Sequence, residues 1–333
     1  MARLALWAVL MIGVLAACDP LGQEPVPDSA DSAPKEAAAS VMFWAHGREV
    51  ATGPWPESSF RGELDSPVTA LAVVNDQLLA GAEDGAIRQL IPVQVADGGR
   101  LAPSRRVQPG CRIEAMAGRA RQLWVLYRAC DDQSLHVALI QLPDLKLTAQ
   151  HPLASDHGGP VAMAIGQEHL FVLISDPFEL TRLRLSDLTP EGRIDLRQVL
   201  RPAYGFGQLL FVDESLWVID RYRDGLIQVR PQGLGIDVSR SFASLDIPGA
   251  IVACDAHQQQ VYCLAGGALH ALDPVSMRAR RLHTVSAQLD ALLVYGDRLM
   301  FGNSDGTLLL ETLSGEIEAL TEQALPAHIV FLH

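Results

Sequence analysis

Basic residues are scarce in this chain of 333 residues, which carries 26 lysines and arginines against 39 aspartates and glutamates, a net charge of −13. Almost all of its cations are arginines, since lysine occurs only at Lys35 and Lys146. Nucleic acids and anionic lipid surfaces attract proteins with an excess of positive charge. The composition therefore argues against nucleic acid as a partner and against peripheral docking on anionic lipid. It is compatible with a basic protein partner.

Patterns that mark common redox, metal and catalytic sites are also missing. The sequence holds no C-x-x-C, which argues against a thioredoxin-like site and a zinc ribbon. Its histidines form no H-E-x-x-H. A G-x-S-x-G match begins at Gly302, but a nucleophile elbow needs a helix after the turn, and Thr307–Leu310 is typical of a strand. We predict no catalytic residue, no metal ligand and no cofactor.

The apolar run at residues 4–17 is shorter than the roughly 20 residues that cross a bilayer. It follows Arg3 and ends in small residues, as secretory signal peptides do. Its last part, Leu15-Ala16-Ala17-Cys18, resembles the lipobox of bacterial lipoproteins. The resemblance implies cleavage before Cys18, a diacylglycerol on its thiol and a fatty acid such as palmitate on its amine. The mature protein would then be anchored by lipid to a membrane, on the periplasmic side.

Three regions follow from this start. Residues 1–17 are the expected signal peptide, and residues 18–40 are the lipidated cysteine and a flexible tether rich in Pro, Ala, Ser and acidic residues. Residues 41–333 are the expected folded body. Asp19 resembles the inner-membrane retention signal of enterobacterial lipoproteins, and the outer membrane stays an alternative.

The body repeats one pattern about every 40–45 residues. A short apolar strand and a polar turn precede a second strand that contains Leu or Val followed by a large apolar residue. A third strand often follows Asp-Gly, a strong hairpin signal. Four short strands per repeat are typical of a β-propeller blade. The second strands contain Leu78-Leu79, Leu123-Trp124, Leu170-Phe171, Leu216-Trp217, Val261-Tyr262 and Leu299-Met300.

Both ends of the body contain incomplete repeats. His328–Leu332 resembles a first strand with no chain left to complete its blade, whereas residues 41–45, 48–51 and 59–64 form short strands without a first partner. Joining them would close an all-β propeller of seven four-stranded blades, with the terminal strands paired and no open sheet edges between blades. Six blades with an extra strand, or eight blades, remain alternatives.

The remaining four cysteines predict two disulfides in an exported protein. The points halfway between Cys111 and Cys130, and between Cys254 and Cys263, both fall in a turn between the first two strands of a repeat. Each pair would thus join adjacent antiparallel strands within one blade. Buried free thiols are the alternative.

Two groups of residues are candidates for partner binding. Four aspartates recur in the turn after the second strand, where they could form an acidic rim for a basic partner or a cation, or simply cap the turns. Arginines and aromatic residues, which are favoured interface anchors, cluster on two loops that should belong to one blade. The aspartates are Asp84, Asp132, Asp224 and Asp305, and the loop residues are Tyr204, Phe206, Arg221, Tyr222 and Arg223.

The last repeats resemble the blades of quinoprotein-type propellers, on the strength of residues 302–308, 313–316 and 268–273. The other repeats depart from that pattern, and the Trp-Asp dipeptides of WD repeats are absent, so a quinone cofactor is not implied. The lipobox combined with such repeats also resembles the propeller lipoprotein of the outer-membrane β-barrel assembly machinery. We therefore expect a non-enzymatic, lipid-anchored scaffold that binds protein partners in the cell envelope. A propeller enzyme, or a sensor that binds a small ligand or metal in the central channel, is the alternative.

Overall fold

The structure is a computed structural model in which Met42–Leu332 form one compact unit. In the part of the chain described, no helix has the length and apolar character that crossing a bilayer requires. The described residues are 41–52, 60–95, 98–154, 161–175, 178–198, 206–212, 214–220, 225–230, 233, 235–237, 251–257, 260–273, 275–276, 278–284, 291–295, 298–302, 308–312, 317–321 and 328–332.

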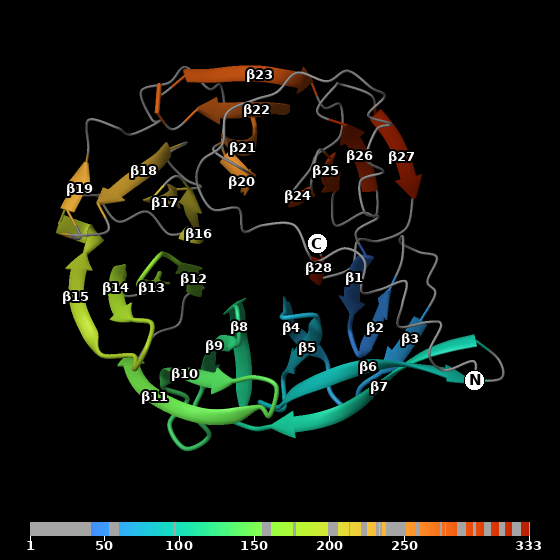
Figure 1. Cartoon of the computed structure of the whole chain (residues 1–333). Helices are drawn as coiled ribbons and strands as arrows, with labels where there is room; N and C mark the ends of the chain where they lie inside the picture. Colours follow the sequence, from blue (N-terminus) through green and yellow to red (C-terminus); the bar gives the residue numbers. More distant parts are fainter. Residues whose placement is uncertain are drawn as a thin grey trace, which may run out of the picture. The chain divides into compact units, whose positions relative to one another are not determined.

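Five sheets each contain four antiparallel strands in chain order, from the innermost to the outermost (Figure 1). We number them blades 3 to 7, and a short 3-10 helix, η1 (Leu196–Gln198), follows blade 4. Blade 3 is β8 (Arg112–Arg119), β9 (Gln122–Arg128), β10 (Leu135–Gln141) and β11 (Lys146–Ala154); blade 4 is β12 (Val161–Ile165), β13 (His169–Ile174), β14 (Glu179–Arg184) and β15 (Pro190–Asp195); blade 5 is β16 (Phe206–Val212), β17 (Ser215–Asp220), β18 (Gly225–Arg230) and β19 (Gly235–Asp237); blade 6 is β20 (Ile251–His257), β21 (Gln260–Ala265), β22 (Ala268–Asp273) and β23 (Arg278–Thr284); blade 7 is β24 (Ala291–Tyr295), β25 (Arg298–Gly302), β26 (Leu308–Thr312) and β27 (Ile317–Thr321).

The sixth sheet has eight strands and holds the closure of the propeller. Its order is β28-β1-β2-β3-β7-β6-β5-β4, so the last strand of the chain pairs with the first. Blade 1 is made from both ends of the body, and it joins blade 2 through a parallel pairing of β3 with β7. Blade 1 is β28 (His328–Leu332), β1 (Val41–His46), β2 (Glu49–Thr52) and β3 (Phe60–Glu63); blade 2 is β4 (Val68–Val74), β5 (Gln77–Ala82), β6 (Ile87–Val95) and β7 (Gly98–Val107).

The described strands therefore make the seven blades that the sequence predicts. The innermost strands contact one another in succession from β4 through β8, β12, β16 and β20 to β24, and β28 contacts β4 (Figure 1). Strands from the two ends of the body complete one blade, which is the predicted closure. Hydrogen bonding between β28 and β1 covers edges that would otherwise be open to other chains.

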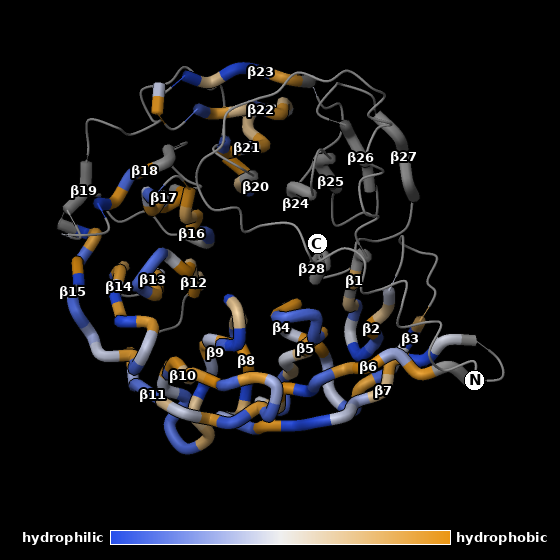
Figure 2. The backbone as a smooth tube through the Cα atoms, viewed as in Figure 1, coloured by the Kyte–Doolittle hydropathy of each residue, from blue (hydrophilic) through white to orange (hydrophobic). Residues whose placement is uncertain are grey.

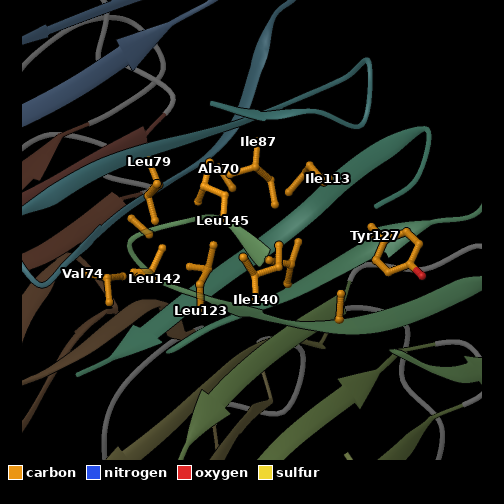
Figure 3. Close-up of a cluster of buried hydrophobic side chains, with 13 residues drawn as sticks. Ala70, Val74, Leu79, Ile87, Ile113, Leu123, Tyr127, Ile140, Leu142 and Leu145 are labelled. Carbon is orange, nitrogen blue, oxygen red and sulfur yellow. The ribbon is translucent and has the colours of Figure 1, made fainter. Parts of the chain in front are cut away.

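The core consists of apolar layers between neighbouring blades. One layer packs Val74, Leu79 and Ile87 of blade 2 against Leu123 and Ile140 of blade 3 (Figure 3). Middle strands are buried on both faces, so they are continuous apolar runs rather than alternating ones, whereas hydrophilic stretches lie on outer strands such as β15 and β23 (Figure 2). Trp124 and Trp217 are fully buried, so both belong to the core.

Both predicted disulfides are present. Cys254 and Cys263 lie directly opposite each other on β20 and β21, and neither side chain is exposed. Cys111 and Cys130 lie just beyond the paired ends of β8 and β9, where the Cys111 amide donates to the Arg128 carbonyl. Each disulfide joins the first two strands of one blade or the segments next to them.

Turn-forming residues at Gly118-Arg119 and at Asp255-Ala256 predict two turns that the structure places a few residues later. Strand β8 continues through Gly118 and Arg119 and turns at Ala120, whose φ is 54°. Strand β20 likewise runs through Asp255 to His257. Both turns instead lie halfway between the paired cysteines, so the disulfide geometry locates them better than the presence of turn-forming residues does.

Candidate functional site

One end of the blades carries two of the aspartates that the sequence singles out. Because the four strands of a blade alternate in direction, the turn after the second strand lies at the same end as the connection to the next blade. Asp84, in the β5–β6 turn, and Asp132, in the β9–β10 turn, are both at this end. Phe206 begins β16, while Tyr204, Arg221, Tyr222, Arg223, Asp224 and Asp305 lie outside the described residues, as does Cys18.

Asp84 is an internal counter-ion as well as a turn cap. Its Oδ2 lies 2.5 Å from Nη2 of Arg88, whose side chain is only 4% exposed. Its Oδ1 accepts the Ala86 amide at 3.1 Å, and Arg106 approaches at 3.6 Å. The hydrogen bond from Arg88 holds the pKa of the Asp84 carboxyl below its ordinary value. The carboxylate is thus engaged within blade 2.

Asp132 caps its turn through Ser134. Oδ1 of Asp132 accepts the Ser134 amide at 2.9 Å and the Ser134 hydroxyl at 2.6 Å, and these bonds lower the pKa of the Asp132 carboxyl. The Ser134 Oγ also lies 2.8 Å from Nε2 of His136. Since the hydroxyl proton points to Asp132, the imidazole donates to the serine and does not activate it. This serine is also buried, so the constellation supports a turn rather than a nucleophile.

The turn-capping explanation therefore accounts for the two aspartates that can be seen. Asp84 and Asp132 occupy equivalent turns, as the repeat predicts, and each carboxylate bonds to its own turn. Whether Asp224 and Asp305 act in the same way stays a prediction. Across the described ranges, no three His, Cys, Asp or Glu side chains are grouped as ligands for a metal ion.

A depression that the sequence did not indicate lies where blade 1 meets blade 2. Its volume is about 680 Å³, and strands β1, β2, β3 and β7 or the turns beside them supply its lining. The parallel pairing sets Arg61 of β3 beside Arg100 of β7. The antiparallel pairing of β2 with β3 sets Glu49 beside Glu63. We call this depression the seam site; its residues are His46, Arg48, Glu49, Arg61, Gly62, Glu63, Gly99 and Arg100.

The charge of the seam site is opposite in sign to that of the chain. Three arginines face two glutamates, and Glu49 is bound by Arg61 at 3.3 Å. Arg48 and Arg100 are exposed, and neither has an ion-pair partner among the residues described. Like charges side by side on neighbouring strands repel each other. The arrangement can therefore accept an anionic group, with the guanidinium planes suited to carboxylate or phosphate.

Sequence reasoning missed this site because no local pattern marks it. Arg48 lies in a turn and Arg61 on the nearby strand β3, whereas Arg100 lies much later in the chain, on β7. Only the parallel pairing of β3 with β7 brings the last two together. In an acidic chain, a group with more arginines than glutamates indicates a candidate site for anions. This group can be recognised only once the positions of the strands are known.

Comparison with known proteins supports the fold. No known protein family matches the chain by sequence, and neither does any curated protein. Among solved structures, BamB from Moraxella catarrhalis is similar with a TM-score of 0.54 and 14% identity, over 86% of this chain and 85% of that chain.

Two further structures show that the likeness extends across propellers. A Bacteroides fragilis protein, provisionally described as a 6-phosphogluconolactonase, has a TM-score of 0.64 and 11% identity, over 91% of this chain and 100% of that chain. The WD40 domain of Neurospora crassa Pan2 has a TM-score of 0.58 and 10% identity, over 86% and 87%. Identities this low establish the fold alone: the chain is a β-propeller.

Proposed function

We propose that this protein is a lipid-anchored β-propeller that acts as a non-enzymatic scaffold and binds protein partners in the cell envelope. The observation that carries the proposal is the propeller fold, which in this chain closes by its own ends into seven blades and is similar overall to that of BamB. Such a fold presents loops from every blade on a rigid frame, and loops held on rigid frames commonly carry binding functions. The lipobox at Cys18 supports the anchor, and two disulfides support an oxidising compartment.

The anchor and its location are tested together. Mature wild-type protein is expected in the membrane fraction, with a mass that includes diacylglycerol and a fatty acid on Cys18. The Cys18→Ser variant should lose both the added mass and the membrane association. An unmodified cysteine in mature wild-type protein would overturn the anchor. Separation of inner and outer membranes then decides between the location favoured by Asp19 and its alternative.

The scaffold function is tested by partner capture from the envelope. Full-length lipidated protein, crosslinked in cells and purified after solubilisation, is expected to retain a defined partner in constant proportion. An unrelated lipoprotein of similar size and charge is the control for capture through the membrane alone. Retention of the same proteins by both would contradict the proposal.

The likeness to the Bacteroides fragilis protein favours one competing function, a propeller enzyme that acts on a sugar lactone. Purified protein is not expected to hydrolyse 6-phosphogluconolactone faster than buffer. Saturable hydrolysis, with no partner captured from the envelope, would replace the scaffold function with the enzymatic one.

A further inference from the structure

The seam site has the features of a binding site for anions. It combines a depression of about 680 Å³ with two arginines, Arg48 and Arg100, that have no ion-pair partner among the described residues. The third arginine, Arg61, is held by Glu49, although its side chain is still 57% exposed. Pairing of β3 with β7 keeps Arg61 and Arg100 together in spite of their repulsion.

Two features favour a ligand with several carboxylates over a single small anion. The carbonyl of Arg48 accepts the amide of Leu64, three residues along the chain from Arg61, so the positive charge of the seam site extends over about 10 Å. In an extended peptide, side chains on one face recur about every 7 Å, which places two acidic residues within that span. The carboxylate of Glu63, which has no ion-pair partner in the described part of the chain, would repel a compact multiply charged group.

We propose that the seam site binds an acidic, extended segment of a protein partner, with carboxylates seated on Arg100 and Arg48. This inference rests on the proposed scaffold function and specifies how the partner is held. The net charge of −13 disfavours acidic ligands elsewhere on the surface, so a locally positive depression would select the position and register of the segment. Exposed charge pairs are individually weak, so specificity would come from several of them acting together.

The probe is an eight-residue synthetic peptide with glutamate at alternating positions, compared with a peptide that has glutamine at those positions. Binding to the full-length mature protein in neutral detergent is measured by fluorescence anisotropy. The acidic peptide should bind and weaken as salt rises, and the glutamine peptide should not bind. Equal binding of both peptides would overturn the proposal. So would saturation by inorganic phosphate at the same concentrations, or binding to phosphatidylglycerol vesicles without binding to the peptide.

Variants locate the binding. Arg100→Gln should weaken it about fivefold, and Arg48→Gln by a similar factor. Glu63→Gln should strengthen it, since the change removes a repulsive charge. Arg278→Gln, an exposed arginine on outer strand β23, is the matched control and should leave affinity unchanged. Thermal unfolding checks that each variant is folded. If the folded Arg100→Gln and Arg48→Gln variants bind the acidic peptide with unchanged affinity, the peptide does not bind at the seam site and the proposal is wrong.

The two proposals fail in different ways. If both Arg100→Gln and Arg48→Gln still capture the partner, the proposed role of the seam site is overturned and the scaffold function is not affected. Absence of any captured partner, together with normal peptide binding, would instead overturn the scaffold function.

Discussion

Asp84 shows how one repeated turn residue can serve the structure twice. Its carboxylate caps the β5–β6 turn through the Ala86 amide and neutralises Arg88, which is almost completely buried. A buried guanidinium without a counter-ion is costly, because charge is poorly solvated in the protein interior. The Asp-Gly dipeptide of this turn predicts the hairpin, but it does not reveal the ion pair four residues later.

Replacing Asp84 with asparagine should destabilise the protein by about 2 kcal/mol. Removing one partner of a buried pair costs about 3–5 kcal/mol, and the partial exposure of Asp84 reduces that figure. Chemical denaturation at neutral pH measures the loss. Asp187→Asn, an exposed carboxylate in the turn between β14 and β15, is the control and should cost less. Equal losses would show that Arg88 does not depend on Asp84.

The same pair predicts a dependence on pH. The pKa of Asp84 is lowered in the folded protein, chiefly by Arg88, so its contribution to stability is present above the unfolded pKa and is lost as pH falls through the folded pKa. The difference in unfolding free energy between wild type and Asp84→Asn should therefore shrink below about pH 4. A difference that stays constant from pH 7 to pH 3 would contradict this assignment.

Among the structural elements, the short strand β28 closes the propeller. It contributes only His328–Leu332, yet it pairs with β1 and contacts β4, so it holds both ends of the body in one blade. Truncation before His328 should lower the denaturant midpoint more than any single substitution above, and should promote aggregation through the exposed edge of β1. Adding a peptide of residues 328–333 should restore part of the stability. Unfolding identical to wild type would show that closure does not depend on this strand.

The parallel pairing of β3 with β7 depends on a glycine. A Cβ on Gly62 would lie 2.4 Å from the backbone oxygen of Leu101, so any side chain forces the strands apart. Gly62→Ala should destabilise the protein by about 1–3 kcal/mol, measured by denaturation. Gly47→Asn is the control, because asparagine tolerates the positive φ of this position and no atom lies nearby. Similar costs at both glycines would argue against close approach as the cause.

At the scale of strands and blades, the sequence predicts those features that depend on residues close together in the chain. Apolar strands and polar turns repeat along the chain, so the blades and their closure could be predicted. The join between blades 1 and 2 could not, because it depends on how far the β6–β7 hairpin extends and on a pairing between residues such as Arg61 and Arg100. Turn-forming residues alone also misplace the turn at Ala120, since the chain adopts a positive φ there without glycine.

For the whole molecule, charge and fold lead to different expectations. The net charge of −13 predicts an acidic surface, whereas two of the aspartates that recur in the turns, Asp84 and Asp132, are engaged in their own turns. The positive seam site depends on residues that only tertiary structure brings together. Composition could therefore predict the average surface but not its local exception, and a binding site is a local property.

The two disulfides join the stability of the whole molecule to its compartment. Each closes a short loop, with sequence separations of 19 and 9 residues, and loops of this size stabilise a fold by about 2–3 kcal/mol. Oxidised protein should accordingly be more stable than fully reduced protein by several kcal/mol, measured by urea denaturation with and without dithiothreitol. Equal stability of the two forms would show that the disulfides do not support the fold.

Reduction should also occur in a defined order. Cys130 is exposed, whereas Cys254 and Cys263 are fully buried, so a thiolate can reach the first disulfide while the second requires the blade to open. Alkylation and mass spectrometry during reduction should therefore find Cys111 and Cys130 modified first. Mild urea should accelerate modification of Cys254 and Cys263 and have little effect on Cys111 and Cys130. Only the buried disulfide needs local opening of its blade before a thiolate can reach it. Simultaneous modification of all four cysteines in native buffer would contradict the packing of blade 6 around its disulfide.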